Sequence, residues 1–95
     1  MASNLNVTFG KNIRIFRKHL NFTMVQMAKE VPMSQSFLSQ VENGKKDLTL
    51  DMMGKIVNFF ICASGFTYNE VIKILFNQSD DQALKELINS MNLDK

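Results

Sequence analysis

The sequence predicts an all-α protein of five to six helices. Apolar residues recur at spacings of three and four along nearly the whole chain, and no segment alternates apolar and polar residues as a half-exposed strand does. The 95 residues include only one proline and four glycines. With 45% apolar residues, the chain can bury the core of one small domain. We divide it into residues 1–63 and a C-terminal helical part, residues 64–95.

The first helix is expected from about residue 8 to residue 20. Its apolar residues fall on one stripe, at i, i+4, i+7 and i+11. They are Phe9, Ile13, Phe16 and Leu20. Basic residues lie off that stripe, at Lys11, Arg14 and Lys18. Residues 20–22 turn the chain.

Two short helices follow, joined by a tight turn. The first begins at Thr23, which forms a capping-box pattern with Gln26, and it breaks at Pro32, whose ring has no amide hydrogen to donate. Ser34 caps the next helix, about residues 35–43, and Gly44 ends it in a left-handed conformation. The apolar side of this third helix consists of Phe37, Leu38 and Val41.

Three more helices complete the chain. Thr49 caps the fourth, which a break at residues 63–66 separates from the fifth. Two further capping boxes, Thr67 with Glu70 and Ser79 with Gln82, predict helices to about residue 76 and residue 92.

The charge is unevenly distributed along the chain. The net charge is +2, but residues 1–55 carry +4 and residues 56–95 carry −2. A basic N-terminal part and an acidic C-terminal part are typical of a protein that binds a polyanion through one end. Ordinary surface charge is the alternative at this stage.

No residues form an enzymatic or metal-binding pattern, so we expect no catalytic activity, no metal and no cofactor. Cys62 is the single cysteine and His19 the single histidine, without partners at ligand spacing. No nucleophile stands beside a base. The N-terminus lacks a basic segment followed by an apolar run, and no apolar stretch is long enough to cross a membrane, so we expect a cytoplasmic protein.

The third helix carries small polar side chains on the face that a core does not need. The glutamine amide can hold adenine by two hydrogen bonds in the major groove, and serine can bind a base edge or a phosphate. Flanking basic residues could reach the DNA backbone. A solvated amphipathic helix is the alternative. The polar residues are Gln35, Ser36, Ser39 and Gln40.

The order of residues from about Ile13 to Phe60 resembles the lambda-repressor-like family, the Cro and cI type of helix-turn-helix regulator. The matching residues keep the family's spacing without gaps. They are Arg17, Thr23, Ala28, Ser34, Leu38 and Val41, then the run 42–45 (Glu-Asn-Gly-Lys), then Leu50 and Ile56. This resemblance implies a lambda-repressor-like DNA-binding domain, followed here by a C-terminal helical extension, in a bacterial or phage-type, nucleoid-associated protein.

The resemblance also implies roles for individual residues. The base-reading positions are Gln35, Ser36 and Gln40. Phosphate contacts are implied for Ser34, Asn43 and Lys45. To these we add Lys46, Lys11 and Arg14, from their charge and position. Arg17 and Glu42 match a structural ion pair that orients the reading helix.

The chain departs from the family pattern at two positions. Met24 replaces a glutamine that contacts a phosphate, so that contact is expected to be lost. Pro32 replaces a glycine that needs positive φ, so the turn must be built differently. Phe37 is large for its position and is expected to pack partly inward, the alternative being contact with a thymine methyl group.

The C-terminal helices are expected to form a dimer interface, because pairing doubles the contacts over a near-palindromic site. The candidate residues are Val71, Leu75, Leu84, Leu87, Ile88 and Met91. The alternative is that these helices complete the monomer core. Together the sequence predicts a dimeric DNA-binding regulator, a repressor. The other class that it allows is an antitoxin or adaptor whose main partner is a protein.

Overall fold

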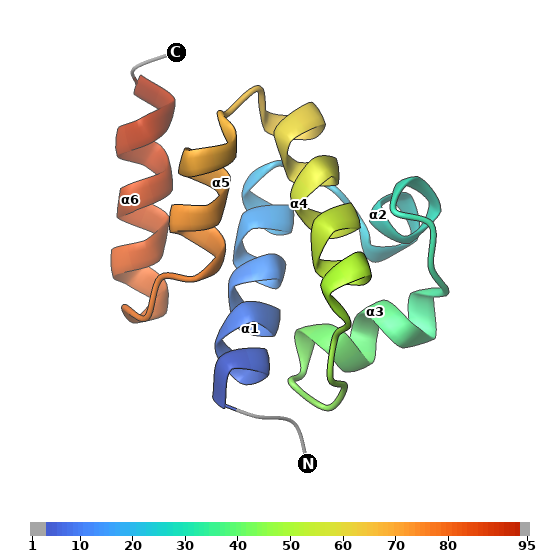
Figure 1. Cartoon of the computed structure of the whole chain (residues 1–95). Coiled ribbons are helices and arrows are strands. Elements are labelled where there is room, and N and C mark those ends of the chain that lie inside the picture. The colour runs from blue at the N-terminus through green and yellow to red at the C-terminus, as the bar shows by residue number, and fades with distance from the viewer. Residues whose placement is uncertain (1–3, 94–95) are drawn as a thin grey trace.

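Six helices make up the fold (Figure 1). The computed structural model describes the backbone of residues 4–93 and the side chains of residues 5–91. Residues 1–3 of the first predicted part and residues 94–95 of the second lie outside the described residues. Over the described backbone it contains no strand, which confirms the all-α prediction. The helices are α1 (Asn4–His19), α2 (Met24–Glu30), α3 (Gln35–Glu42), α4 (Leu50–Ser64), α5 (Tyr68–Leu75) and α6 (Asp81–Leu93).

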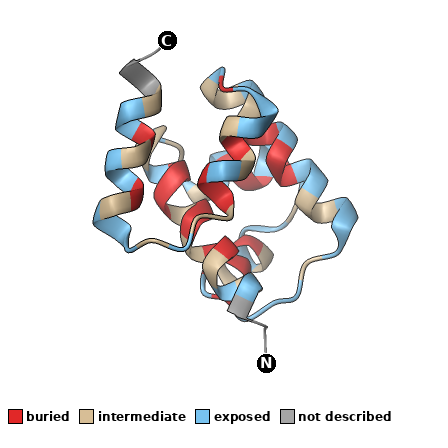
Figure 2. Cartoon of the chain, turned by 60° about the vertical axis from the view of Figure 1, so that its left-hand side comes forward, coloured by how far each residue is buried: buried red, intermediate tan, exposed pale blue. Residues whose placement is uncertain are grey.

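The helices are arranged around α1 and α4, which occupy the middle of the molecule. In Figure 1, α2 and α3 lie on one side of this pair and α5 and α6 on the other. α1 contacts α3, α5 and α6, so it joins the two sides. Figure 2 shows that the buried residues lie on the inward sides of the helices.

Most predicted helix starts are confirmed by their caps. Thr23 and Thr67 each form a complete capping box, and Ser34 and Thr49 accept a hydrogen bond from the third residue of their helix. The cap predicted at Ser79 is wrong. The Asp80 carboxylate accepts from the Ala83 amide instead, because the Ser79 amide and hydroxyl both donate to Asn77 Oδ1.

One hydrophobic core runs through both predicted parts of the chain, from Phe9 to Ile88. The rings of Phe16 and Phe60 stack with centroids 4.4 Å apart. The ring of Phe9 lies 4.9 Å from that of Phe76, which ties α1 to the end of α5. The boundary at residues 63/64 is therefore a turn between helices that share a core.

This core corrects the predicted dimer interface. Four of the six candidate residues are completely buried within the single chain: Val71, Leu75, Leu84 and Ile88. Their apolar faces are already covered by α1 and by one another's helices, so they are not available to a partner. Leu87 and Met91 are partly buried against the same core. The alternative, that these helices complete the monomer core, holds for the four buried residues.

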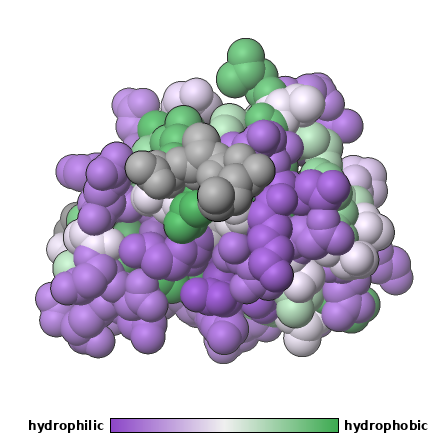
Figure 3. Space-filling view, turned by 90° about the horizontal axis from the view of Figure 1, so that it is seen from below, coloured by the Kyte–Doolittle hydropathy of each residue, from purple (hydrophilic) through white to green (hydrophobic). Residues whose placement is uncertain are grey.

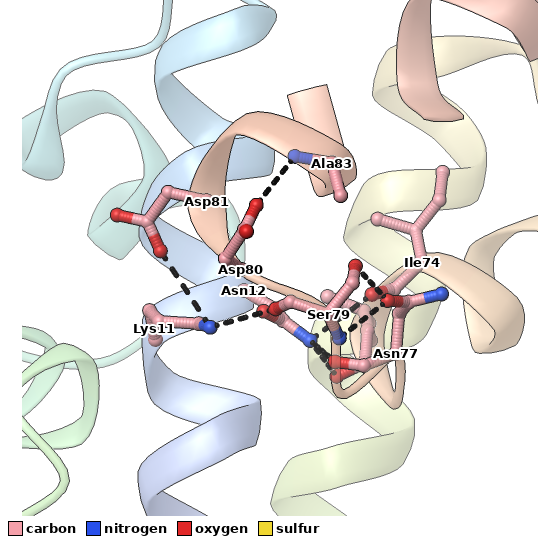
Figure 4. Close-up of polar contacts among 9 residues, drawn as sticks. Lys11, Asn12, Ile74, Asn77, Ser79, Asp80, Asp81 and Ala83 are labelled. Carbon is pink, nitrogen blue, oxygen red and sulfur yellow. Dashed lines mark hydrogen bonds and ion pairs between the residues drawn. The ribbon is translucent and has the colours of Figure 1, made fainter. Parts of the chain in front are cut away.

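A polar clamp from α1 holds the C-terminal helices in place (Figure 4). The fully buried Asn12 side chain donates to the carbonyl oxygens of Ile74, Leu75 and Asn77, at 3.2, 3.0 and 2.7 Å. These carbonyls lie at the end of α5, where a helix leaves its last acceptors without partners. The clamp therefore supplies a donor to the carbonyls of Leu75 and Asn77, and adds one to the Ile74 carbonyl, which also accepts from backbone amides of residues 76 and 77.

Candidate nucleic-acid interface

The turn between α2 and α3 is built around Pro32 without a left-handed residue. Val31 caps α2 with ordinary helical angles, and the Met33 amide donates to the Ala28 carbonyl at 2.8 Å. From residue 22 to residue 43 the structure contains no positive φ. The prediction that proline requires a different turn is confirmed, because its fixed ring excludes the positive φ that the family glycine adopts.

The α3 helix is divided into a buried and an open side. Leu38 and Val41 are buried, and Phe37 packs partly against the core as predicted. On the other side, Gln35 and Ser36 are exposed and Gln40 is half-buried. Among the described residues, none of these three side chains has a hydrogen-bond partner. Their donors and acceptors are therefore free for an outside ligand.

The position of α3 is fixed first by a close approach to α1. A Cβ atom added to Gly10 would lie 2.0 Å from the Val41 carbonyl oxygen, far inside contact distance. Only glycine lets the two backbones come this near. At the end of α3, Gly44 has φ +70° and packs against Val7 of α1.

A buried ion pair provides the second link between α1 and α3, as predicted. Arg17 Nε lies 2.7 Å from Glu42 Oε2, and Arg17 Nη2 donates to Glu42 Oε1 at 3.0 Å. The remaining Nη1 donates to the Phe22 carbonyl at 2.8 Å. The two residues are only 6% and 5% exposed. This bidentate geometry sets the rotation of α3 about its axis and so decides which side chains face outward.

Several predicted phosphate ligands lie at the two ends of α3 and in the loop that follows it. Ser34 is exposed; its oxygen accepts from the Phe37 amide at 3.0 Å, which leaves its hydroxyl proton available. Asn43 is exposed and donates to the Ser39 carbonyl at 2.8 Å. Lys45 and Lys46 are exposed in the loop after Gly44 and form no ion pair with a described residue.

The two basic residues of α1 are placed differently. The Lys11 ammonium donates to the Ser79 carbonyl at 3.1 Å and lies 3.5 Å from Asp81, as Figure 4 shows. This side of α1 faces α6, whereas Gly10 faces α3. Lys11 is therefore paired within the chain by a partly exposed ion pair, and its phosphate contact stays a prediction. Arg14 lines a hollow with Asp81 and other residues of α1 and α6, and its phosphate contact stays a prediction.

The face that carries α3 is polar. In Figure 1, α3 and the α3–α4 loop lie at the lower end of the molecule, and Figure 3 shows that most of the lower face is hydrophilic. Asp47 in this loop accepts from the Asn6 side chain at 2.6 Å. The described residues contain no group of three or more His, Cys, Asp and Glu that could hold a metal ion. None of the helices of residues 4–93 is long and apolar enough to cross a membrane.

Met24 is half-buried and packs against the core. A thioether has no hydrogen to donate, so it cannot replace the family's phosphate-binding amide.

Two positioning residues were missed at the level of sequence. Asn12 lies on the apolar face of α1, three residues after Phe9 and four before Phe16, and a polar residue at such a place indicates a buried hydrogen bond. Gly10 lies within a helical pattern, where a glycine either destabilises the helix or allows another segment to pack closely against it. Only the structure shows that close packing applies.

Comparison with known proteins identifies the family. No curated protein and no solved structure gives a match. A helix-turn-helix family model (HTH_3), the Cro/cI type, matches residues 13–64, which is more than half of the chain and contains α2, the turn, α3 and α4. The chain therefore belongs to the Cro/cI-type helix-turn-helix family of DNA-binding proteins.

Proposed function

We propose that this chain is a sequence-specific transcriptional repressor that binds double-stranded DNA as a homodimer, with α3 in the major groove. The family implies DNA binding and transcriptional regulation. The observation that carries the finer proposal is the open side of α3, where the side chains of Gln35, Ser36 and Gln40 have no hydrogen-bond partner among the residues that the structure describes. A helix with such a face, rigidly held by its other side, suits reading of base edges.

The proposed roles divide the contacts into two kinds. Gln35 and Gln40 read base edges, for which the two hydrogen bonds of an amide to adenine are the best match, and Ser36 binds a neighbouring base. Ser34, Asn43, Lys45 and Lys46 contact phosphates and fix the register of α3 on the duplex. Base contacts give the sequence preference, and phosphate contacts give most of the salt-dependent affinity.

The homodimer follows from the size of the reading face. One helix of eight residues covers only a few base pairs, so a second copy is needed for a specific site. Two copies related by a two-fold axis read a near-palindromic sequence, with half-sites about 10 base pairs apart or a multiple of this. In this proposal, the bound dimer represses transcription because it occupies a promoter. The protein would then be located at the nucleoid.

Selection of bound sequences from a random DNA pool tests this proposal. We expect one enriched motif with two inverted halves. Repeating the selection with Gln35→Ala should relax the preference at the same position in each half. A pool that shows no enriched motif, or a motif that is unchanged by Gln35→Ala and Gln40→Ala, would contradict base reading by α3.

A further inference from the structure

Basic side chains gather in a hollow between α1 and α6, away from the reading helix. In Figure 1, α6 and α3 lie on different sides of the central pair of helices. The hollow has a volume of about 440 Å³, which is the size of a small-molecule site. We call it the α1–α6 hollow, and its lining residues are Arg14, Ile15, Lys18, His19, Asp81 and Lys85.

The one acid in this lining already has a partner. The Asp81 carboxylate lies 3.5 Å from the Lys11 ammonium of α1 (Figure 4). In contrast, Arg14, Lys18 and Lys85 form no ion pair with a described residue. The α1–α6 hollow therefore keeps three positive charges without a counter-charge from the described part of the chain.

The helix dipoles explain only part of this cluster. Lys18 lies in the last turn of α1, where a cation is favourable. Arg14 lies four residues earlier, at a spacing that sets two like charges side by side and destabilises a helix. Lys85 lies in the N-terminal half of α6, where the dipole gives a cation no advantage. The folded chain would therefore gain stability from an anion that balances these charges.

We propose that the α1–α6 hollow binds the diphosphate group of a small phosphorylated molecule. Three cations on two helices border one volume, so a ligand that balances them needs more than one negative charge. The planar guanidinium of Arg14 can hold two oxygens of one phosphate, and the lysine ammonium groups bind phosphate as point charges. A diphosphate is the compact group that presents several such oxygens together.

The short lining of the hollow favours a compact ligand over an extended one. It comprises residues between 14 and 19 of α1 and residues 81 and 85 of α6, less than two turns of each helix. An acidic peptide or a DNA duplex spreads its charges along a chain and would need a longer basic track. A diphosphate keeps its charges within reach of all three cations.

DNA on α3 does not account for the α1–α6 hollow. Gly10 and Arg17 are the residues of α1 that face α3, whereas Lys11 reaches Asp81 beside the hollow. A small ligand can therefore occupy the hollow while α3 is on DNA. Because Arg14 is also a predicted ligand of DNA phosphate, Lys18 and Lys85 are the residues that test the hollow.

Isothermal titration calorimetry of the full chain with inorganic pyrophosphate, at constant ionic strength, tests the inference. We expect one site per chain, and weaker binding of orthophosphate because it carries fewer charges. Lys18→Gln and Lys85→Gln should each raise the pyrophosphate Kd by about 5-fold. The double variant should raise it by about 25-fold, since the two cations lie on different helices and act nearly independently.

Lys73→Gln is the matched control, because Lys73 is exposed on α5, outside the lining of the hollow. It should change the pyrophosphate Kd by less than about 2-fold. No saturable binding up to about 10 mM pyrophosphate, an unchanged Kd in the double variant, or an equal loss in Lys73→Gln would overturn the inference. Urea unfolding gives a second measurement: pyrophosphate should stabilise the wild type and leave the double variant unchanged.

Two comparisons distinguish the small phosphorylated ligand from other polyanions. An oligoglutamate peptide should bind more weakly than pyrophosphate, and tighter binding of the peptide would overturn the inference. The slope of log K against log salt for DNA binding should be the same in the double variant and the wild type. A slope reduced by about 2 would assign these lysines to the DNA backbone instead. None of these outcomes depends on whether DNA binding is sequence-specific.

Discussion

Replacing Gly10 and Gly54 by alanine should have opposite effects on stability, although the chemical change is identical. A Cβ atom at residue 10 would lie 2.0 Å from the Val41 carbonyl oxygen, and 3.1 and 3.3 Å from the carbonyl carbons of Val41 and Glu42. All three atoms belong to the backbone of α3, so no side chain can rotate away. Since carbon and oxygen make contact at about 3.3 Å, α3 must move by about 1 Å.

The expected magnitudes follow from two terms. Overpacking destabilises the fold by about 3 kcal/mol at the upper end of its usual range, whereas alanine stabilises a helix by about 1 kcal/mol relative to glycine. Gly10→Ala should therefore lower the free energy of unfolding by about 2 kcal/mol. Gly54→Ala meets nothing within 4 Å and should raise it by about 0.5–1 kcal/mol.

Urea unfolding, followed by circular dichroism at a concentration where the chain is monomeric, measures both free energies. The two variants should differ by about 3 kcal/mol with the same dependence on urea. A Gly10→Ala variant at least as stable as the wild type would refute the close approach of α1 and α3, and with it the way in which α1 fixes the position of α3.

Three further predictions concern the buried and exposed charges and the clamp. Glu42→Gln should cost about 3–5 kcal/mol in urea unfolding, because it leaves the Arg17 charge buried without a counter-charge; Lys55→Met, which breaks the exposed pair with Asp51, should cost under about 0.5 kcal/mol. Asn12→Leu should cost about 1–3 kcal/mol and speed hydrogen exchange at the end of α5, since three carbonyls there lose the side-chain donor that ties them to α1; unchanged exchange there would argue against the clamp. Lys45→Ala and Lys46→Ala should each weaken binding to all DNA sequences and reduce the slope of log K against log salt by about 1; a loss confined to one sequence would show that these lysines read bases instead.

The local signals in the sequence were sufficient for most helix starts. A capping box involves four consecutive residues, so Thr23 and Thr67 could be identified without knowledge of the fold. The same pattern failed at Ser79, because Asn77 competes for its amide and hydroxyl. The competition depends on the path of the α5–α6 turn, which the pattern does not contain.

The long-range contacts could not be predicted in the same way. Helical periodicity indicates that the apolar faces of Leu84 and Ile88 are buried, but not whether the covering surface belongs to the same chain. Charge along the sequence does not show which lysines are free either. Lys11 and Lys45 both belong to the basic N-terminal part, yet Lys11 is paired with Asp81 and Lys45 is exposed to solvent. Base reading by Gln35, Ser36 and Gln40 stays a prediction from the family resemblance. The structure adds that these three side chains of α3 have no hydrogen-bond partner among the described residues.

Binding of the wild type and Gln35→Ala to the selected sequence and to a permuted one is the most direct measurement of base reading by α3. Fluorescence anisotropy at fixed salt gives the four dissociation constants. Gln35→Ala should weaken binding to the selected sequence by about 10- to 100-fold and change binding to the permuted one by no more than about 2-fold. Equal losses on both sequences, or no loss on either, would show that α3 does not specify the DNA sequence.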